Sequence, residues 1–320
     1  MLNVLLTTDT EAWPRRPAGP DASLDPNFGR DVYGETSSGE YGIRYQVERL
    51  NAYGLKAVIF VESLVASAAG RSRLEKVVST IQNAGHDVQL HLHTEWLGWM
   101  SKPLLPGRTG QHIKDFSFEE QTLLIRQGLQ NLRDCGAAKI NAFRAGNFGA
   151  NRETLRALAA LGVVYDTSYN ACYLAGACAI TDDEPIVQPR YIEGVFEVPV
   201  TVFRDIPGHY RPVHIAGCSS SELRNMLLLA WRRGWRAFVI VSHSFELLNG
   251  TRLRPDPIAV RRFERICAFL AQNPDKFRTT TFSEISPDDL DSRMMSEPLS
   301  SNVFRTGLRA MEQIARRWHQ

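Results

Sequence analysis

Two pairs of residues in the sequence have the spacing of metal ligands. His91 and His93 close a short apolar run, and Asp9 and Glu11 follow another run near the start of the chain. Residues i and i+2 of an extended backbone point to the same side, so each pair could face one pocket. Two neutral imidazoles and a carboxylate, with one position left open, form a usual catalytic zinc site. The spacing of the two pairs is therefore compatible with a catalytic metal site.

Other polar residues stand where predicted strands end. They are Arg144, Asp166 and His243, while Glu95 lies just beyond the two histidines. In parallel α/β folds, catalytic groups gather at the carboxyl ends of the strands. An isolated H-x-H pair is more often two hydrogen-bonded histidines than a metal site, because the motif alone is weak. Several strand ends that each carry a titratable side chain favour a shared site instead.

The elements that must position these residues alternate along the chain. Apolar runs of strand length cover residues 2–8, 55–61, 87–92, 138–143, 163–166, 195–200, 237–241 and 277–282. Helical patterns cover residues 45–52, 74–84, 119–135, 152–161, 221–233 and 258–271. This alternation predicts a parallel sheet covered by helices. About eight runs in one array favour a barrel over an open doubly wound sheet.

Composition limits the class of protein. The chain has 320 residues, of which 43% are hydrophobic, and a formal net charge of +2. It can therefore build a large core and gives no reason to expect nucleic acid as a partner. Its first apolar run stops at Asp9, and no stretch approaches about 18 uninterrupted apolar residues. The five cysteines lack metal-site spacing. We expect a cytoplasmic protein without a transmembrane segment.

The pattern changes after residue 286. We predict a barrel domain over residues 1–286 and a C-terminal tail over residues 287–320. The last twenty residues carry four arginines against one glutamate, interleaved with apolar residues at helical spacing. A basic amphipathic helix of this kind could dock weakly on a membrane surface or a partner, or pack against its own domain. The sequence leaves both alternatives open.

The ordered set of motifs resembles a known family. The similarity is carried by T-T-D-T-E, G-H-D-V-Q-L-H-L-H-T-E-W, F-R-A-G-N-F-G, Y-D-T-S-Y and V-S-H-S-F-E-L. These segments resemble the five motifs of the polysaccharide deacetylases, the NodB-homology proteins of carbohydrate esterase family four, from Leu2 to about Ile285. The resemblance implies an α/β fold, a distorted (β/α) barrel of seven or eight mostly parallel strands. It also implies metal-dependent removal of an acetyl group from an N-acetylated sugar or glycan.

Two motifs depart from the best-known members of that family. Those members begin with T-F-D-D, whereas Thr10 fills the place of the second aspartate here and Glu11 follows it. Their second motif is H-x-x-x-H, whereas this chain has His91, then His93, with Glu95 in the place of the second histidine. A divergent branch with H-x-H-x-x-W is the closer match. The resemblance therefore implies Glu11 and His91 as metal ligands and His93 or Glu95 as the third. We prefer His93 for its nitrogen and its same-face position.

The resemblance and the chemistry of amide hydrolysis assign roles to the remaining residues. Asp9 would be the general base toward water, and His243 the acid that protonates the leaving amine. Arg144 would hold Asp9 by a charge-assisted pair, and Asp166 would orient His243 through its ring N–H. Zinc is the expected divalent ion, although cobalt, nickel and iron accept the same ligands.

Aromatic residues near the motifs predict a carbohydrate substrate. Trp13 follows the first motif, and Trp96 and Trp99 stand at the second. Flat aromatic faces can stack on sugar rings, and core packing is an equal alternative for Trp96. Two other functions stay open. One is a NodB-like hydrolase of a non-sugar C–N bond, such as a cyclic imide or ureide, and the other is a catalytically silent carbohydrate-binding relative.

Overall fold

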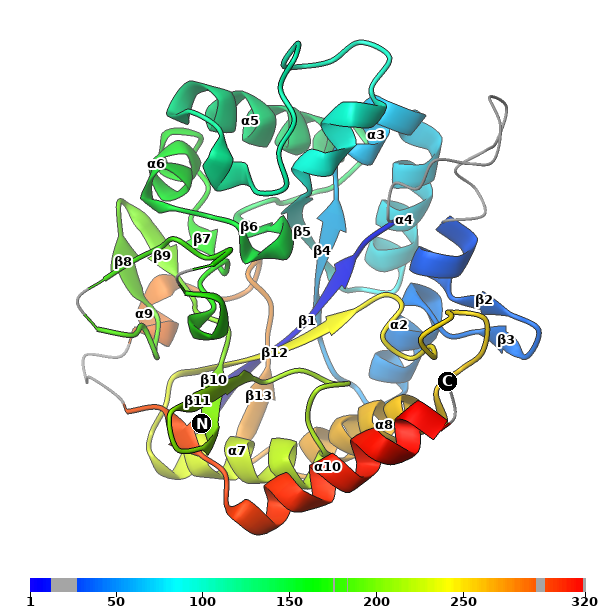
Figure 1. The fold of residues 1–320 in the computed structure, drawn as a ribbon, viewed down its shortest axis with the longest axis vertical. Helices are drawn as coiled ribbons and strands as arrows, with labels where there is room; N and C mark the ends of the chain where they lie inside the picture. The colour runs from blue at the N-terminus through cyan, green and yellow to red at the C-terminus, as the bar shows by residue number, and fades with distance from the viewer. Residues whose placement is uncertain (13–27, 175, 183, 292–296, 319–320) are drawn as a thin grey trace.

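The strands form a curled main sheet at the centre of the molecule (Figure 1). The structure is a computed structural model that describes residues 1–12, 28–174, 176–182, 184–291 and 297–318. The sheet has the order β12-β1-β4-β5-β6-β7-β9-β8, with β13 paired to the beginning of β1. Its strands are β1 (Leu2–Thr10), β4 (Val58–Glu62), β5 (Asp87–Leu92), β6 (Ala142–Ala145), β7 (Tyr165–Asp166), β8 (Arg190–Ile192), β9 (Val195–Glu197), β12 (Ala237–His243) and β13 (Phe277–Thr279).

Helices surround this sheet (Figure 1). They are α2 (Ile43–Ala52), α3 (Val65–Ala69), α4 (Arg71–Asn83), α5 (Phe118–Asp134), α6 (Arg152–Ala160), α7 (Ser220–Arg232), α8 (Pro257–Ala271), α9 (Pro287–Leu290) and α10 (Val303–Trp318), with shorter helical turns η1 (Gly29–Tyr33), η2 (Thr94–Trp99), η3 (Ile113–Asp115), η4 (Gly146–Phe148) and η5 (Ala171–Tyr173). Ser117, Asn151 and Ser219 cap α5, α6 and α7 by accepting a backbone N–H three residues further on.

The side chains of β1 alternate between two apolar clusters, one on each face of the sheet. Val4 and Leu6 join the large cluster under the helices, whereas Leu5 joins the smaller cluster with Phe60 and Val239. Successive residues of a strand point to opposite faces, so a strand between two apolar layers must be apolar throughout. Every described pairing in the sheet is parallel except that of β8 with β9. The predicted distorted barrel is confirmed in the form of a half-barrel.

Short elements outside the main sheet were not predicted. They are the hairpin of β2 (Glu35–Thr36) with β3 (Gly39–Glu40), and a small sheet of β10 (Val202–Ile206), β11 (His209–Pro212) and β14 (Leu299–Ser300). These strands have two to five residues. A run of this length carries too few alternations to show a periodic pattern.

The tail packs against the rest of the chain. Figure 1 shows α10, in red, lying across α7 and α8. The buried Arg309 guanidinium lies 2.9 Å from Asp205 and 3.3 Å from Glu222, and Arg316 pairs with Asp256 at 2.6 Å. Within the described ranges, no helix is long and apolar enough to cross a membrane. The domain boundary at residue 286 and the cytoplasmic location stay predictions.

Replacing Arg309 by alanine should lower the free energy of unfolding by about 3 kcal/mol, because the change removes one partner from buried ion pairs. Burial raises the pKa of Asp205, but hydrogen bonds from His209, Arg211 and Arg309 lower it further, to below its ordinary value. The stabilisation is therefore fully present above the unfolded carboxyl pKa of about 4 and is lost as the pH falls from there.

Urea unfolding at neutral and at acid pH measures this effect. Arg305→Ala is the matched control, because Arg305 lies on the same helix and forms no ion pair with a described residue. An equal loss in both variants would contradict an anchoring role for Arg309.

Candidate active site

Neighbouring strands bring the predicted residues to one edge of the sheet. In the strand register, Asp9 lies beside His243, and His91 lies beside both Glu62 and Arg144. Parallel strands end at the same edge, so their terminal side chains meet there. Asp9, His91 and His243, together with Glu11 just beyond β1, line a cavity of about 470 Å³.

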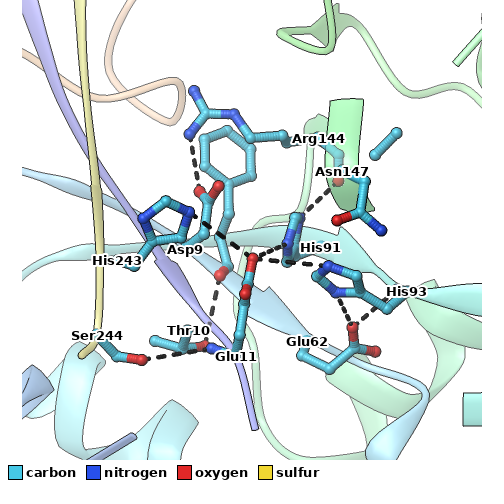
Figure 2. Close-up of polar contacts among 12 residues, drawn as sticks. Asp9, Thr10, Glu11, Glu62, His91, His93, Arg144, Asn147, His243 and Ser244 are labelled. Carbon is cyan, nitrogen blue, oxygen red and sulfur yellow. Dashed lines mark hydrogen bonds and ion pairs between the residues drawn. The ribbon is translucent and has the colours of Figure 1, made fainter. Parts of the chain in front are cut away.

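The carboxylate of Glu11 lies among three imidazoles (Figure 2). Its Oε1 atom is 3.3 Å from His91 Nε2, 3.6 Å from His93 Nε2 and 3.9 Å from His243 Nε2. The ligand atoms of Glu11, His91 and His93 lie within 4.8 Å of one another, and all three side chains are buried. The structure thus brings together three of the four residues predicted as metal ligands.

Hydrogen bonds fix which nitrogen of each histidine faces Glu11. His91 Nδ1 lies 2.8 Å from the carbonyl oxygen of Arg144, and His93 Nδ1 lies 2.9 Å from Glu62 Oε2. Glu62 also accepts the backbone N–H of His93 and that of Leu64. Since these oxygens only accept, both Nδ1 atoms carry the proton, and each neutral ring directs its Nε2 lone pair towards Glu11. Carboxylates and carbonyls commonly orient metal-binding histidines in this way.

This donor set fits a divalent ion. Two nitrogen lone pairs and a carboxylate in one buried space require positive charge between them. Without a metal, that charge is a proton. Burial opposes an imidazolium, but the charge of Glu11 and the bond to Glu62 raise the pKa of His93 to about 9. Burial likewise opposes ionisation of Glu11, but His93, His91 and His243 lower its pKa to about 2. Glu11, His91 and His93 would hold the ion, and its binding would displace the proton of His93.

Asp9 is fixed by a buried arginine. Arg144 Nη1 donates to Asp9 Oδ1 at 2.7 Å and to Thr7 Oγ1 at 2.9 Å, and its guanidinium lies over the ring of Phe60. Figure 2 shows the carboxylate of Asp9 between Arg144 and the carboxylate of Glu11. The geometry gives Asp9 a defined position at the cavity wall, beside the three residues that could hold a metal ion.

The group that orients His243 is Glu246, and the predicted role of Asp166 is wrong. His243 Nδ1 lies 2.8 Å from Glu246 Oε2, and His214 Nε2 lies 3.1 Å from the same oxygen. Asp166 instead accepts hydrogen bonds from the backbone N–H and hydroxyl of Ser168. Burial raises the pKa of Asp166 and of its neighbour Glu197. The spacing of three between His243 and Glu246 was the signal in the sequence that could have found this contact.

The alternative third ligand, Glu95, is not grouped with Glu11. Its Oε1 atom accepts from Asn147 Nδ2 at 3.0 Å. Trp96 is 1% exposed and packs in the core, so it offers no free face to a sugar, which corrects its predicted role. Trp99 is half-buried against the same core and does not line the cavity. Trp13 lies outside the described residues.

Other aromatic residues line the cavity and were not predicted. Phe148 and Tyr173 stack with their ring centroids 5.6 Å apart, and Phe245 stacks on the ring of His243. Asn147, Phe148 and Arg252, all at the cavity, have φ angles of 54°, 56° and 58°. Residues other than glycine rarely adopt this left-handed backbone conformation, because it is strained for them. Strained backbone of this kind is found most often at functional sites. Periodicity cannot reveal such residues, because they lie in irregular turns.

Comparison with known proteins identifies the fold. No protein-family model matches the sequence, and no curated protein sequence matches it significantly. The chain is similar to the crystal structure of a presumed polysaccharide deacetylase from Mycobacterium smegmatis, with a TM-score of 0.54, 16% identity, and 93% of this chain and 94% of that chain covered. The half-barrel is thus the fold of that structure.

Two further structures show weaker similarity. A family 4 carbohydrate esterase from Streptomyces lividans, in complex with acetate, has a TM-score of 0.45 and 15% identity over 89% of this chain and 94% of that one. A family 4 pseudoenzyme from Bacillus anthracis has a TM-score of 0.43 and 11% identity over 94% of this chain and 69% of that one.

Substitutions can separate the two candidates for the third ligand. We expect Glu62→Gln to weaken zinc binding by about 10- to 100-fold, the usual loss when a residue that orients a ligand is replaced. His93→Ala removes a ligand itself, so it should weaken zinc binding by more than about 100-fold. Glu95→Gln should change it little. Competition against a chromophoric chelator measures all three. Strong loss in Glu95→Gln with normal binding in His93→Ala would reverse the assignment.

Proposed function

We propose that the chain is a metal-dependent hydrolase of the polysaccharide deacetylase type, which removes an acetyl group from an N-acetylated sugar or glycan. One observation carries the proposal: the buried group of Glu11, His91 and His93 lies beside Asp9 and His243 at a common cavity. Amide hydrolysis needs a polarised carbonyl, an activated water, a base and an acid, and these residues supply a group for each.

The first step of the reaction needs a base that removes a proton from water. A divalent ion, for which we propose zinc, would polarise the acetyl carbonyl and acidify a water molecule. Asp9 accepts the proton of that water, because it lines the cavity next to Glu11. The charge-assisted bond from Arg144, at 2.7 Å, holds Asp9 in place at the cavity.

The second step of the reaction needs an acid that protonates the leaving amine. His243 lines the cavity and donates its proton to the nitrogen of the leaving amine. Burial disfavours the imidazolium, but the hydrogen bond to Glu246 and the charge of Glu11 raise the pKa of His243 to about 9. The ring is therefore protonated at neutral pH, as an acid must be. Glu246 contacts His243 but does not line the cavity, so it is a positioning residue.

The cavity suggests the kind of substrate. Its volume of about 470 Å³ lies in the range of small-molecule sites, which favours a short glycan or a precursor over a long polymer. The stacked rings of Phe148 and Tyr173 offer an aromatic wall to a sugar, in place of the predicted tryptophans.

A hydrolase of a cyclic imide or ureide is the second candidate. Thr10 and Glu95, where the best-known deacetylases have other residues, favour it. The same metal, base and acid would serve that reaction, so only substrates distinguish the two. A catalytically silent relative is opposed by the grouped metal-binding residues.

Substitutions of Asp9 and of Glu11 should lower the activity for different reasons. We expect Asp9→Asn to keep the metal and lose about 10²–10⁴-fold in rate, the usual contribution of a general base. Glu11→Gln should weaken metal binding, because a neutral amide is a poorer ligand than a carboxylate. Excess zinc should then restore part of the activity of Glu11→Gln alone.

Acetate release from an N-acetylated oligosaccharide, followed during zinc titration, makes this comparison. Rescue of Asp9→Asn by zinc would show that Asp9 is the ligand instead. Hydrolysis of a cyclic imide, with no acetate released from any N-acetylated sugar, would favour the second candidate.

Loss of Glu246 should change the pH profile. Because the protonated His243 is the acid, activity falls as the pH rises through its pKa. Glu246→Gln removes the carboxylate whose hydrogen bond raises this pKa, so the alkaline limb should move to lower pH. The pH dependence of kcat measures the shift. An unchanged limb with a lower rate at every pH would mean that Glu246 acts only on stability.

A further inference from the structure

The C-terminal helix is docked with its charged face inward. Arg309, Glu312 and Arg316 of α10 form ion pairs with the domain beneath them. Phe304, Met311 and Ile314 are 75%, 67% and 55% exposed. Positions separated by three, seven and ten residues share one face of a helix, so these three side chains form a single outward ridge.

This orientation is the reverse of the usual one. A surface helix normally buries its apolar stripe and exposes its charged residues. Here the described inward contacts are ion pairs and hydrogen bonds, and the exposed Phe304, Met311 and Ile314 point away from them. Large apolar side chains gathered on an exposed face mark a contact surface for a partner or a membrane.

A basic cluster lies where α10 meets α7 and α8. Arg224 of α7, Arg265 of α8 and Arg305 of α10 line a cavity of about 410 Å³ together with Ser220 and Ser221 at the beginning of α7. Arg305 lies about 100° around the helix from Phe304, on the side where α10 meets α7 and α8. None of the three arginines forms an ion pair within the described part of the chain, and no carboxylate among the described residues lines the cavity. The amino end of α7 adds positive potential.

We propose that this combined face binds the surface of a membrane that contains acidic phospholipids. The ridge of Phe304, Met311 and Ile314 enters the boundary between headgroups and acyl chains, and the three arginines bind lipid phosphates. Since no described helix is long and apolar enough to cross a membrane, the contact lies in the plane of the interface. This inference does not depend on the proposed enzymatic function.

Charge favours a membrane over a second copy of the chain. A two-fold contact places the same patch against itself. If the axis passes through the cavity, the arginine cluster meets the same cluster of the second copy, and no acidic group among the described residues lines either cavity. An anionic lipid surface neutralises the same charges, and each arginine near such a surface contributes to binding.

Vesicle flotation tests the proposal with the full chain. The probes are vesicles of phosphatidylcholine with and without phosphatidylglycerol. We expect binding only to the vesicles with phosphatidylglycerol. Phe304→Ser with Met311→Ser should reduce it by about tenfold or more, because apolar burial is lost. Arg224→Gln and Arg265→Gln should each reduce it by about fivefold.

Tyr191→Ser is the matched control, because Tyr191 is 63% exposed on β8, away from this face. All of these side chains are exposed, so thermal unfolding should stay unchanged. Equal binding to both vesicle types, or binding that the α10 and arginine variants do not reduce, would overturn the proposal. So would a dimer in light scattering that Phe304→Ser dissociates, because the face would then be occupied by a second copy.

Discussion

The buried carboxylate of Glu11 faces the ring nitrogens of His91, His93 and His243, all within 3.9 Å of one oxygen. A carboxylate and nitrogen lone pairs can share a space away from water only if positive charge lies between them. A proton on His93 meets this requirement in the free protein, and a divalent ion meets it with the geometry of a catalytic site. The hydrogen bonds behind His91 and His93 orient both rings towards that space.

Arg144 connects the proposed metal ligands to the proposed base. Its carbonyl oxygen accepts from His91 Nδ1 at 2.8 Å, and its guanidinium donates to Asp9 at 2.7 Å. A single residue of β6 therefore sets both the ring orientation of a ligand and the position of the base. His243 is held from the other side of the cavity by Glu246, in the turn after β12. The site is thus supported by rigid strand ends, which keeps its distances short and fixed.

The sequence predicted the parts of the structure that depend on regular spacing. The buried runs of β1, β5 and β12, and the i, i+2 pairs at the ends of β1 and β5, follow from the two-residue period of a strand. The partner of His243 was assigned wrongly, because the prediction chose Asp166 at the end of another strand over Glu246, which is only three residues away in the sequence. The aromatic wall of Phe148 and Tyr173 was missed, since left-handed turns have no periodic signal. The inward orientation of the α10 arginines could not be predicted, because it depends on the carboxylates of the domain beneath them.

The central claim is that Glu11, His91 and His93 hold one divalent ion. Anomalous diffraction at the zinc edge, from crystals of the zinc-loaded protein, tests it most directly. The account predicts one strong peak at about 2.0–2.2 Å from Glu11 and from the Nε2 atoms of His91 and His93. A peak bound instead by His214, His243 and Glu246, which also lie close enough to hold an ion, would contradict it. So would the absence of any peak at the cavity.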